Sequence, residues 1–102
     1  MLVIPVQAIP NQQLQVQLGT QACTLEITQT AYGLFMNVYV SGTLIVGGVL
    51  CNNVTLIVGN AYLGFIGDMI FLDTQGNSNP VFTGLGVRYQ LLYLTPNDLG
   101  VG

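Results

Sequence analysis

Few side chains in this sequence could do chemistry. Two carboxylates, Asp68 and Asp73, bound the segment DMIFLD, and the chain also contains two cysteines and a single arginine. The aspartates are five positions apart, so on a β-strand they point to opposite faces and cannot form the carboxylate pair of a glycosidase. The chain has no histidine, the usual general acid or base near neutral pH. We therefore predict that the protein is not an enzyme.

The remaining chemical motifs are weak. The segment DTQG resembles the Asp-Thr-Gly loop of aspartic proteases only in part, because Gln75 interrupts the motif, and a strand-ending aspartate followed by a turn explains the same residues. The spacing of Cys23 and Cys51 matches no metal motif, and a zinc site without histidine would need carboxylates. We expect two reduced, partly buried thiols, with a disulfide as the alternative, and neither a metal nor a cofactor.

The charge balance excludes two classes of partner. The chain has one Lys or Arg and four Asp or Glu, for a net charge of −3. One cation cannot neutralise the phosphates of a nucleic acid or bind an anionic lipid surface. Arg88 is therefore expected to form a structural ion pair with a carboxylate, within the chain or across a contact, with anion binding as the alternative.

The most apolar stretch, residues 34–50, raises the question of a membrane span. It contains Asn37 and a Ser-Gly break, is rich in β-branched residues and lacks flanking Lys or Arg. These features predict two strands joined by a turn, and no contact with a membrane is expected.

Alternation of apolar and polar residues predicts β-strands through most of the chain. In PNQQLQVQLGTQACTLEI, leucine and valine alternate with glutamine, which is the period of a strand with one polar face. The pattern predicts an all-β fold, a small antiparallel β-barrel or sandwich of about seven to nine short strands. Extended segments are expected at 2–8, 12–18, 22–29, 34–40, 44–50, 54–58, 68–73 and 87–94.

The chain is expected to form a single β domain over residues 1–102, with an extended N-terminal segment (1–11) and a short C-terminal tail (95–102). Pro5 should confine the first segment to a sheet edge or a chain end. The pair Gly47–Gly48 suggests a bulge or a bend. Because the strands are short and the turns frequent, no long helix is expected.

The polar face of these strands is almost uncharged. A soluble surface is usually about a quarter to a third charged residues, whereas this chain is 5% charged overall. An unpaired charge is costly to bury in a contact, while a neutral amide can be satisfied by partner groups, and interface cores are depleted in charge. The composition therefore favours a structural subunit that is largely covered by other subunits.

Three segments together resemble the small baseplate plug proteins of contractile-tailed bacteriophages. They are IPVQAIPNQQLQVQL, LIVGGVL and NAYLGFIGDMIFLDTQGNSNPVFTGLGVRYQLLYL. The resemblance covers nearly the whole chain in order, although the second and third strands lack the basic and aromatic residues usual in that family. The matching positions are Pro5, Ala8, Pro10, Asn11, Gln12, Tyr62, Leu63, Gly64, Gly67, Met69, Asp73, Gly76, Pro80, Leu85, Gly86, Leu91 and Tyr93.

The resemblance implies a structural role in the virion. It implies a β-rich baseplate subunit, made in the host cytoplasm, that plugs or seals the lumen of the central hub or tube near the spike until contraction. The implied partners are the hub, the spike and the tail tube, with self-association as a trimer or hexamer because the hub has threefold or sixfold symmetry. The residues expected to form assembly contacts are Pro5, Pro10, Asn11, Gln12, Tyr62, Leu63, Arg88 and Tyr93.

Two other hypotheses of function agree with part of the composition and strand pattern. Another virion structural protein, such as a tail tube, adaptor or head-decoration protein, would have a similar composition. A β-barrel carrier of a small apolar ligand would instead be a stable monomer with a hollow core.

Overall fold

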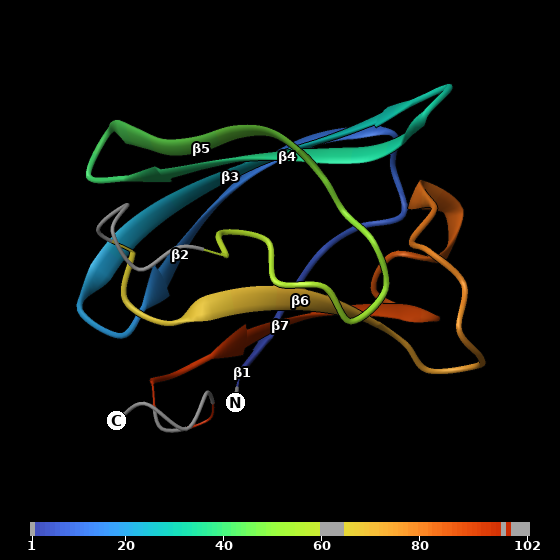
Figure 1. Cartoon of the computed structure of the whole chain (residues 1–102). Coiled ribbons are helices and arrows are strands. Elements are labelled where there is room, and N and C mark those ends of the chain that lie inside the picture. Colours follow the sequence, from blue (N-terminus) through green and yellow to red (C-terminus); the bar gives the residue numbers. More distant parts are fainter. Residues whose placement is uncertain (1, 60–64, 97, 99–102) are drawn as a thin grey trace.

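The strands form two packed layers. The computed structural model describes residues 2–59, 65–96 and 98. In this part of the chain, antiparallel sheets of order β1-β7-β6 and β2-β3-β4-β5 face each other as an open sandwich (Figure 1). The all-β prediction is confirmed, and the architecture is a sandwich rather than a barrel. The elements are β1 (Leu2–Ile4), β2 (Asn11–Leu18), β3 (Gln21–Thr30), β4 (Gly33–Val40), β5 (Thr43–Leu50), β6 (Asp68–Asp73), the short 3₁₀ helix η2 (Phe82–Gly84) and β7 (Tyr89–Leu94).

The four-stranded sheet is a series of hairpins whose side chains follow the predicted alternation. Cys23, Leu25 and Ile27 of β3 are buried, while Glu26 lies half-buried on the opposite face. The first hairpin closes through a two-residue turn in which Gly19 has a φ of 64°, a conformation that glycine adopts without steric cost.

The predicted bulge is present in β5. Val38 pairs with Val46 but Met36 pairs with Val49, so the register shifts across the Gly47–Gly48 pair, and it shifts once more between Val38 and Tyr39. The side chain of Asn37 fills the gap by accepting a hydrogen bond from the Gly48 N–H at 2.7 Å. The edge strand β5 is therefore irregular along its length.

The three-stranded sheet places β7 between β1 and β6. The β1 strand is an edge strand of three residues that ends directly before Pro5, as the proline predicted. The predicted segments 2–8 and 87–94 are both longer than the observed strands. Arg88 does not join the strand because its N–H donates to the Gly84 carbonyl in a turn, at 2.8 Å.

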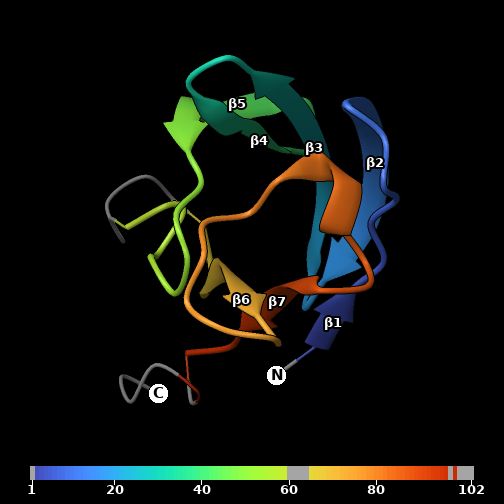
Figure 2. The same cartoon turned by 90° about the vertical axis from the view of Figure 1, so that its right-hand side faces the viewer.

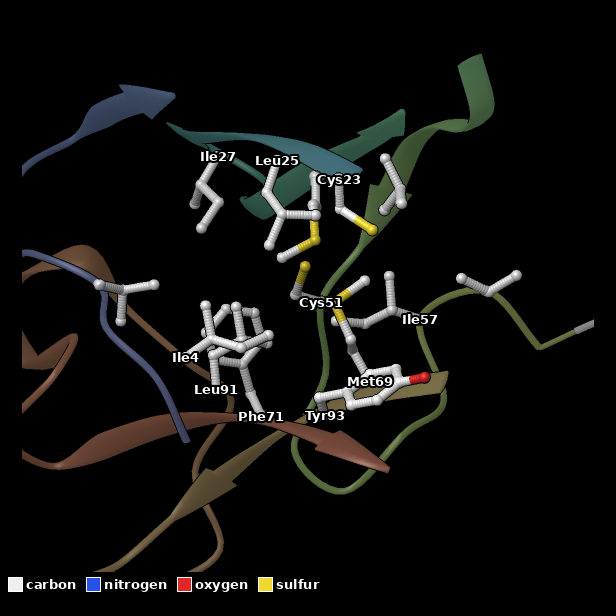
Figure 3. Close-up of a cluster of buried hydrophobic side chains, with 14 of the residues drawn as sticks. Ile4, Cys23, Leu25, Ile27, Cys51, Ile57, Met69, Phe71, Leu91 and Tyr93 are labelled. Carbon is white, nitrogen blue, oxygen red and sulfur yellow. The ribbon is translucent and has the colours of Figure 1, made fainter. Parts of the chain in front are cut away.

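Side chains from both sheets fill the space between them. Figure 3 shows Leu25 and Ile27 from one sheet pointing toward Phe71 and Leu91 from the other. Cys51 lies between the two groups, and all of these residues belong to one buried cluster. The hollow core that a carrier of an apolar ligand would need is occupied here by side chains.

The prediction of a strand at 54–58 is wrong. Val54 has a φ of 54°, which interrupts an extended backbone. The segment instead runs along β6, where the N–H groups of Val54 and Ile57 donate to carbonyls of Phe71 and Met69 at 2.8 and 2.9 Å. Its apolar character has a different cause, because Ile57 and Val58 are buried against the core.

The loop over residues 74–88 covers one end of the sandwich. Residues 74–88 run from the small sheet toward the large one, as Figure 2 shows in orange. The loop is attached to β3 where the N–H of Phe82 donates to Oε1 of Gln29 at 3.0 Å. The edges of the core are therefore covered by connections as well as by strands.

Replacing Gly86 with alanine is expected to lower the free energy of unfolding by about 1–3 kcal/mol. Gly86 has a φ of 79°, and a Cβ atom there would collide with the carbonyl oxygen of Val6. Gly42 is the control, since it has a φ of 82° but no atom within 4 Å of the added Cβ. Urea denaturation of both variants measures the difference, and an equal loss in the two would contradict the packing role of Gly86.

Candidate assembly surface

The outward side of β2 and β3, together with Asn37 of β4, carries mostly neutral polar side chains, and we call it the amide face. Cross-strand pairing places Gln13, Glu26 and Asn37 in one row. Asn37 donates a hydrogen bond from Nδ2 to Oε1 of Glu26 at 3.1 Å, so the carboxylate in this row has a partner. The amide face consists of Asn11, Gln13, Gln15, Gln17, Thr24, Glu26, Thr28 and Asn37. On the same side of the sheet, toward β5, the surface becomes apolar and aromatic through Phe35, Tyr39, Leu44 and Leu50.

The glutamines of this chain have two kinds of role. Several hold the backbone together: Gln21 is buried, accepts from the Ile66 N–H at 2.9 Å and donates to its carbonyl at 3.0 Å. By contrast, the side-chain amides of Gln13 and Gln15 make no hydrogen bond to the described part of the chain. These exposed amides are available to a partner molecule, and each can both donate and accept.

Open depressions lie on the amide face. Two of them have volumes of about 400 and 410 Å³, one beside Gln15 and Thr24 and the other beside Gln13 and Glu26. Both are open to solvent rather than enclosed, which suits contact with a broad protein surface better than enclosure of a small ligand.

The outward face of the three-stranded sheet is hydrophobic, and we call it the apolar face. Val3, Leu92 and Ile70 form one cross-strand row. Val3 is 55% exposed and Leu72 is 36% exposed, so apolar surface here faces solvent. Sequence reasoning missed this face because β6 and β7 are apolar on both sides. The face consists of Val3, Ile70, Leu72, Gln90, Leu92 and Leu94.

The single arginine is used inside the fold. Nε and Nη2 of Arg88 each donate to a carboxylate oxygen of Asp73 at 2.8 Å, which confirms the predicted ion pair. Asp73 also accepts from the N–H groups of Gln75 and Ser78, at 2.9 and 2.8 Å. The hydrogen bonds from Arg88 are the main reason that the pKa of Asp73 lies well below its ordinary value.

The other buried carboxylate also anchors a loop. Asp68 accepts hydrogen bonds from the N–H groups of Val58, Gly59 and Met69 at 2.8, 2.7 and 2.7 Å. Both aspartates that could have done chemistry are therefore engaged in holding loops against the small sheet, and they hold different loops.

The two cysteines are free and buried. Burial raises the pKa of the Cys51 thiol to about 12 and also raises the pKa of Cys23. The prediction of reduced thiols is confirmed, and the disulfide alternative is not what the structure contains.

Within the described residues, no group of His, Cys, Asp or Glu could hold a metal ion. The same residues contain no helix long and apolar enough to cross a membrane.

Four residues of the predicted contact set lie between Pro5, directly after β1, and Gln12, near the start of β2. Pro5, Pro10 and Asn11 are exposed, and Asn11 begins β2. Gln12 instead holds its own N-terminal segment, because its amide exchanges two hydrogen bonds with the backbone of Gln7, at 3.0 and 2.7 Å. Their roles as assembly contacts stay predictions.

The other predicted contact residues are placed differently. Tyr62 and Leu63 lie outside the described residues. Tyr93 is 3% exposed, and its hydroxyl donates to the Ile66 carbonyl. Arg88 is partly exposed beside its aspartate. Tyr93 and Arg88 thus have structural roles in the chain, and their part in assembly remains untested.

The pH dependence of stability tests the Asp73–Arg88 pair. Because the pKa of Asp73 is lowered by folding, its contribution is present above the unfolded-state pKa of about 3.9 and is lost as the pH falls toward the folded-state pKa. The thermal midpoint should therefore fall on acidification below about pH 4. Asp73→Asn should be less stable at neutral pH and show a smaller acid-induced fall. Thermal midpoints are measured by circular dichroism as a function of pH. If the midpoints of the wild type and Asp73→Asn fell by the same amount on acidification, the stabilising role of the pair would be contradicted.

Thiol reactivity tests the burial of the cysteines. At about pH 8, a thiol-reactive dye should modify native Cys23 and Cys51 slowly, because little thiolate forms at such raised pKa values. Both should react quickly once the protein is unfolded in guanidinium. The variant Thr43→Cys is the control, since position 43 is exposed and should react in the native state. Equal rates at all three thiols would refute the buried placement.

Comparison with known proteins identifies the family. The family model described as "Cyanophage baseplate Pam3 plug gp18" matches residues 1–96. No curated protein matches the sequence closely enough to be counted as a relative. The matched family is structural rather than enzymatic, as the sequence predicted. The chain belongs to the cyanophage baseplate plug family and is a component of the phage virion.

Proposed function

We propose that this chain seals the lumen of the central hub or tail tube near the spike and holds that seal until contraction. The observation that supports this proposal most is that both outward sheet faces are nearly uncharged. The amide face contains one charged residue, Glu26, which is paired with Asn37. The apolar face exposes Val3 and Leu72. Two neutral faces on opposite sides of one sandwich suit a subunit held between neighbours.

The proposed mechanism is steric. Neutral contacts hold the plug without the desolvation penalty of buried charges. No bond is made or broken in the seal, so release needs only a mechanical separation of the contacting surfaces. The buried carboxylates do not take part, because Asp68 and Asp73 are engaged in anchoring loops.

The proposed partners are the hub, the spike and the tail tube. Association with other baseplate components follows from the family, whereas these particular neighbours and a trimeric or hexameric arrangement are our proposal. Copies placed around a tail axis contact one another through unlike surfaces. The presence of two chemically different faces on each copy supports such an arrangement.

Charge introduced into the apolar face tests the proposal. In the phage that encodes this chain, Val3→Lys should reduce the amount of the chain in purified particles by about tenfold or more, because a contact that must bury the ammonium loses at least about 1.4 kcal/mol. Val87→Lys is the matched control, since Val87 is 73% exposed in a loop outside both faces. Quantitative mass spectrometry of the particles measures incorporation.

A second readout addresses sealing itself. Particles that lack the chain should lose DNA on storage or fail to complete their tails, and the Val87→Lys particles should resemble the wild type. Circular dichroism of the purified variants confirms that both fold. Normal incorporation of Val3→Lys together with normal infectivity would overturn the contact role of the apolar face, and stable, infectious particles without the chain would overturn the seal.

A further inference from the structure

The four sheet edges of this sandwich are not protected equally. Exposed strand edges can pair with other chains, and natural proteins protect them with short strands, bulges, prolines or covering loops. The β1 edge is three residues long and is followed by Pro5. The β5 edge has two shifts in register. The β6 edge is covered by the segment at 53–57, which forms an isolated bridge from Asn53 to Phe71 and donates further hydrogen bonds.

Among the described residues, the fourth edge, that of β2, is protected only at its start, where Pro10 precedes the strand and Gln12 holds the backbone of Gln7. The edge from Gln13 to Gln17 has none of these protections. The strand runs over eight residues, and its pairing with β3 is continuous, without a shift in register. Its sequence, NQQLQVQL, has no proline and no charge. A long, regular and uncharged edge is the kind that accepts another strand.

The backbone groups on this edge can be assigned from the hairpin. A two-residue turn joins Leu18 to its partner Gln21, so Leu18, Val16 and Leu14 exchange hydrogen bonds with β3. The bond from the Gln29 N–H to the Pro10 carbonyl, at 2.8 Å, continues the same alternation. The N–H and C=O groups of Gln13, Gln15 and Gln17 consequently face away from β3, toward the open edge.

Side chains beside this edge are only partly packed on the inner face of the sheet and lack hydrogen-bond partners on the outer face. On the inner side, Leu14 and Val16 pack against the core but remain only partly buried. On the outer side, the amides of Gln13 and Gln15 lack hydrogen bonds to the described chain. An added strand would bury Leu14 and Val16 and could form hydrogen bonds with the amides of Gln13 and Gln15.

We propose that the open edge of β2 receives an extended, uncharged strand from a different component of the baseplate. This inference rests on the proposed function. The strand would alternate apolar residues, which extend the inner row of Leu14 and Val16, with amide or hydroxyl residues, which meet Gln13 and Gln15. Backbone hydrogen bonds provide the affinity, and the alternation provides the register.

A second copy of this chain is a poorer occupant. Pairing of β2 with β2 joins two like surfaces, whereas neighbouring copies in the proposed trimer or hexamer meet through unlike ones. The other edges of a second copy are too short at β1, irregular at β5 or already covered at β6. The strand is therefore expected from another protein.

Hydrogen exchange compares the free chain with the chain in purified baseplates. The amides of Gln13, Gln15 and Gln17 should exchange rapidly in the free chain and at least about tenfold more slowly in the baseplate. The amides of Leu14 and Val16 are internal controls, because they bond to β3 and should be protected in both samples. A photo-reactive p-benzoylphenylalanine in place of Gln17 identifies the owner of the added strand when its cross-linked peptides are sequenced.

Protection together with a cross-link to another baseplate component supports the proposal. Unprotected amides, no cross-link, or a cross-link only to a second copy would overturn it. A chain that is absent from the baseplate altogether would instead contradict the proposed function, so the two failures are distinguishable.

A proline variant tests the backbone contact itself. Gln15→Pro removes an outward N–H and leaves the bonds to β3, which an edge strand tolerates. Gln15→Ala is the matched control, since it removes the amide side chain and keeps the N–H. We expect incorporation into baseplates to fall at least about fivefold more for the proline variant, the size expected when about 1 kcal/mol of hydrogen bonding is lost. Equal incorporation of two folded variants would overturn the strand-addition proposal.

Discussion

The packing of two sheet faces against each other determines where the other features of this protein lie. Side chains alternate along each strand, so a residue such as Leu25 that enters the core fixes its neighbour Glu26 on the outside. Because the inner rows are apolar and tightly clustered, the outer rows and the sheet edges are the parts of the sandwich left to contact other molecules. In this chain the outer rows are mainly amides and hydroxyls on β2 and β3, aromatic and leucine side chains on β4 and β5, and mainly aliphatic side chains on the small sheet.

Three of the five charged residues hold loops, and a fourth, Glu26, is hydrogen-bonded to Asn37 on the amide face. Asp73 with Arg88 fixes the loop after β6, and Asp68 fixes the segment before it. Surface charge normally keeps proteins soluble and prevents their association. Its scarcity here is expected for a subunit whose surface is covered by other proteins. This composition agrees with membership in a baseplate plug family, whose members are parts of a larger assembly.

Much of the fold could be predicted because alternation is a local property. The ranges of β2 to β6 lie within about two residues of their predicted bounds, and the bulge at Gly47–Gly48 could be predicted from the glycines. The segment at 54–58 could not, because its apolar residues are buried by covering β6 and not by pairing in a sheet. The apolar face was also hidden, since strands that are apolar on both sides do not reveal which side meets solvent.

The most direct test of the account is the structure of the assembled baseplate by electron cryomicroscopy. The solvent-accessible surface of each face is then compared in the particle and in the free chain. If the neutral sheet faces form the assembly contacts, neighbouring proteins should cover most of the amide face and the apolar face. A plug whose two faces remain open to solvent, attached only through its loops or its termini, would contradict the central claim that neutral sheet faces form the assembly contacts.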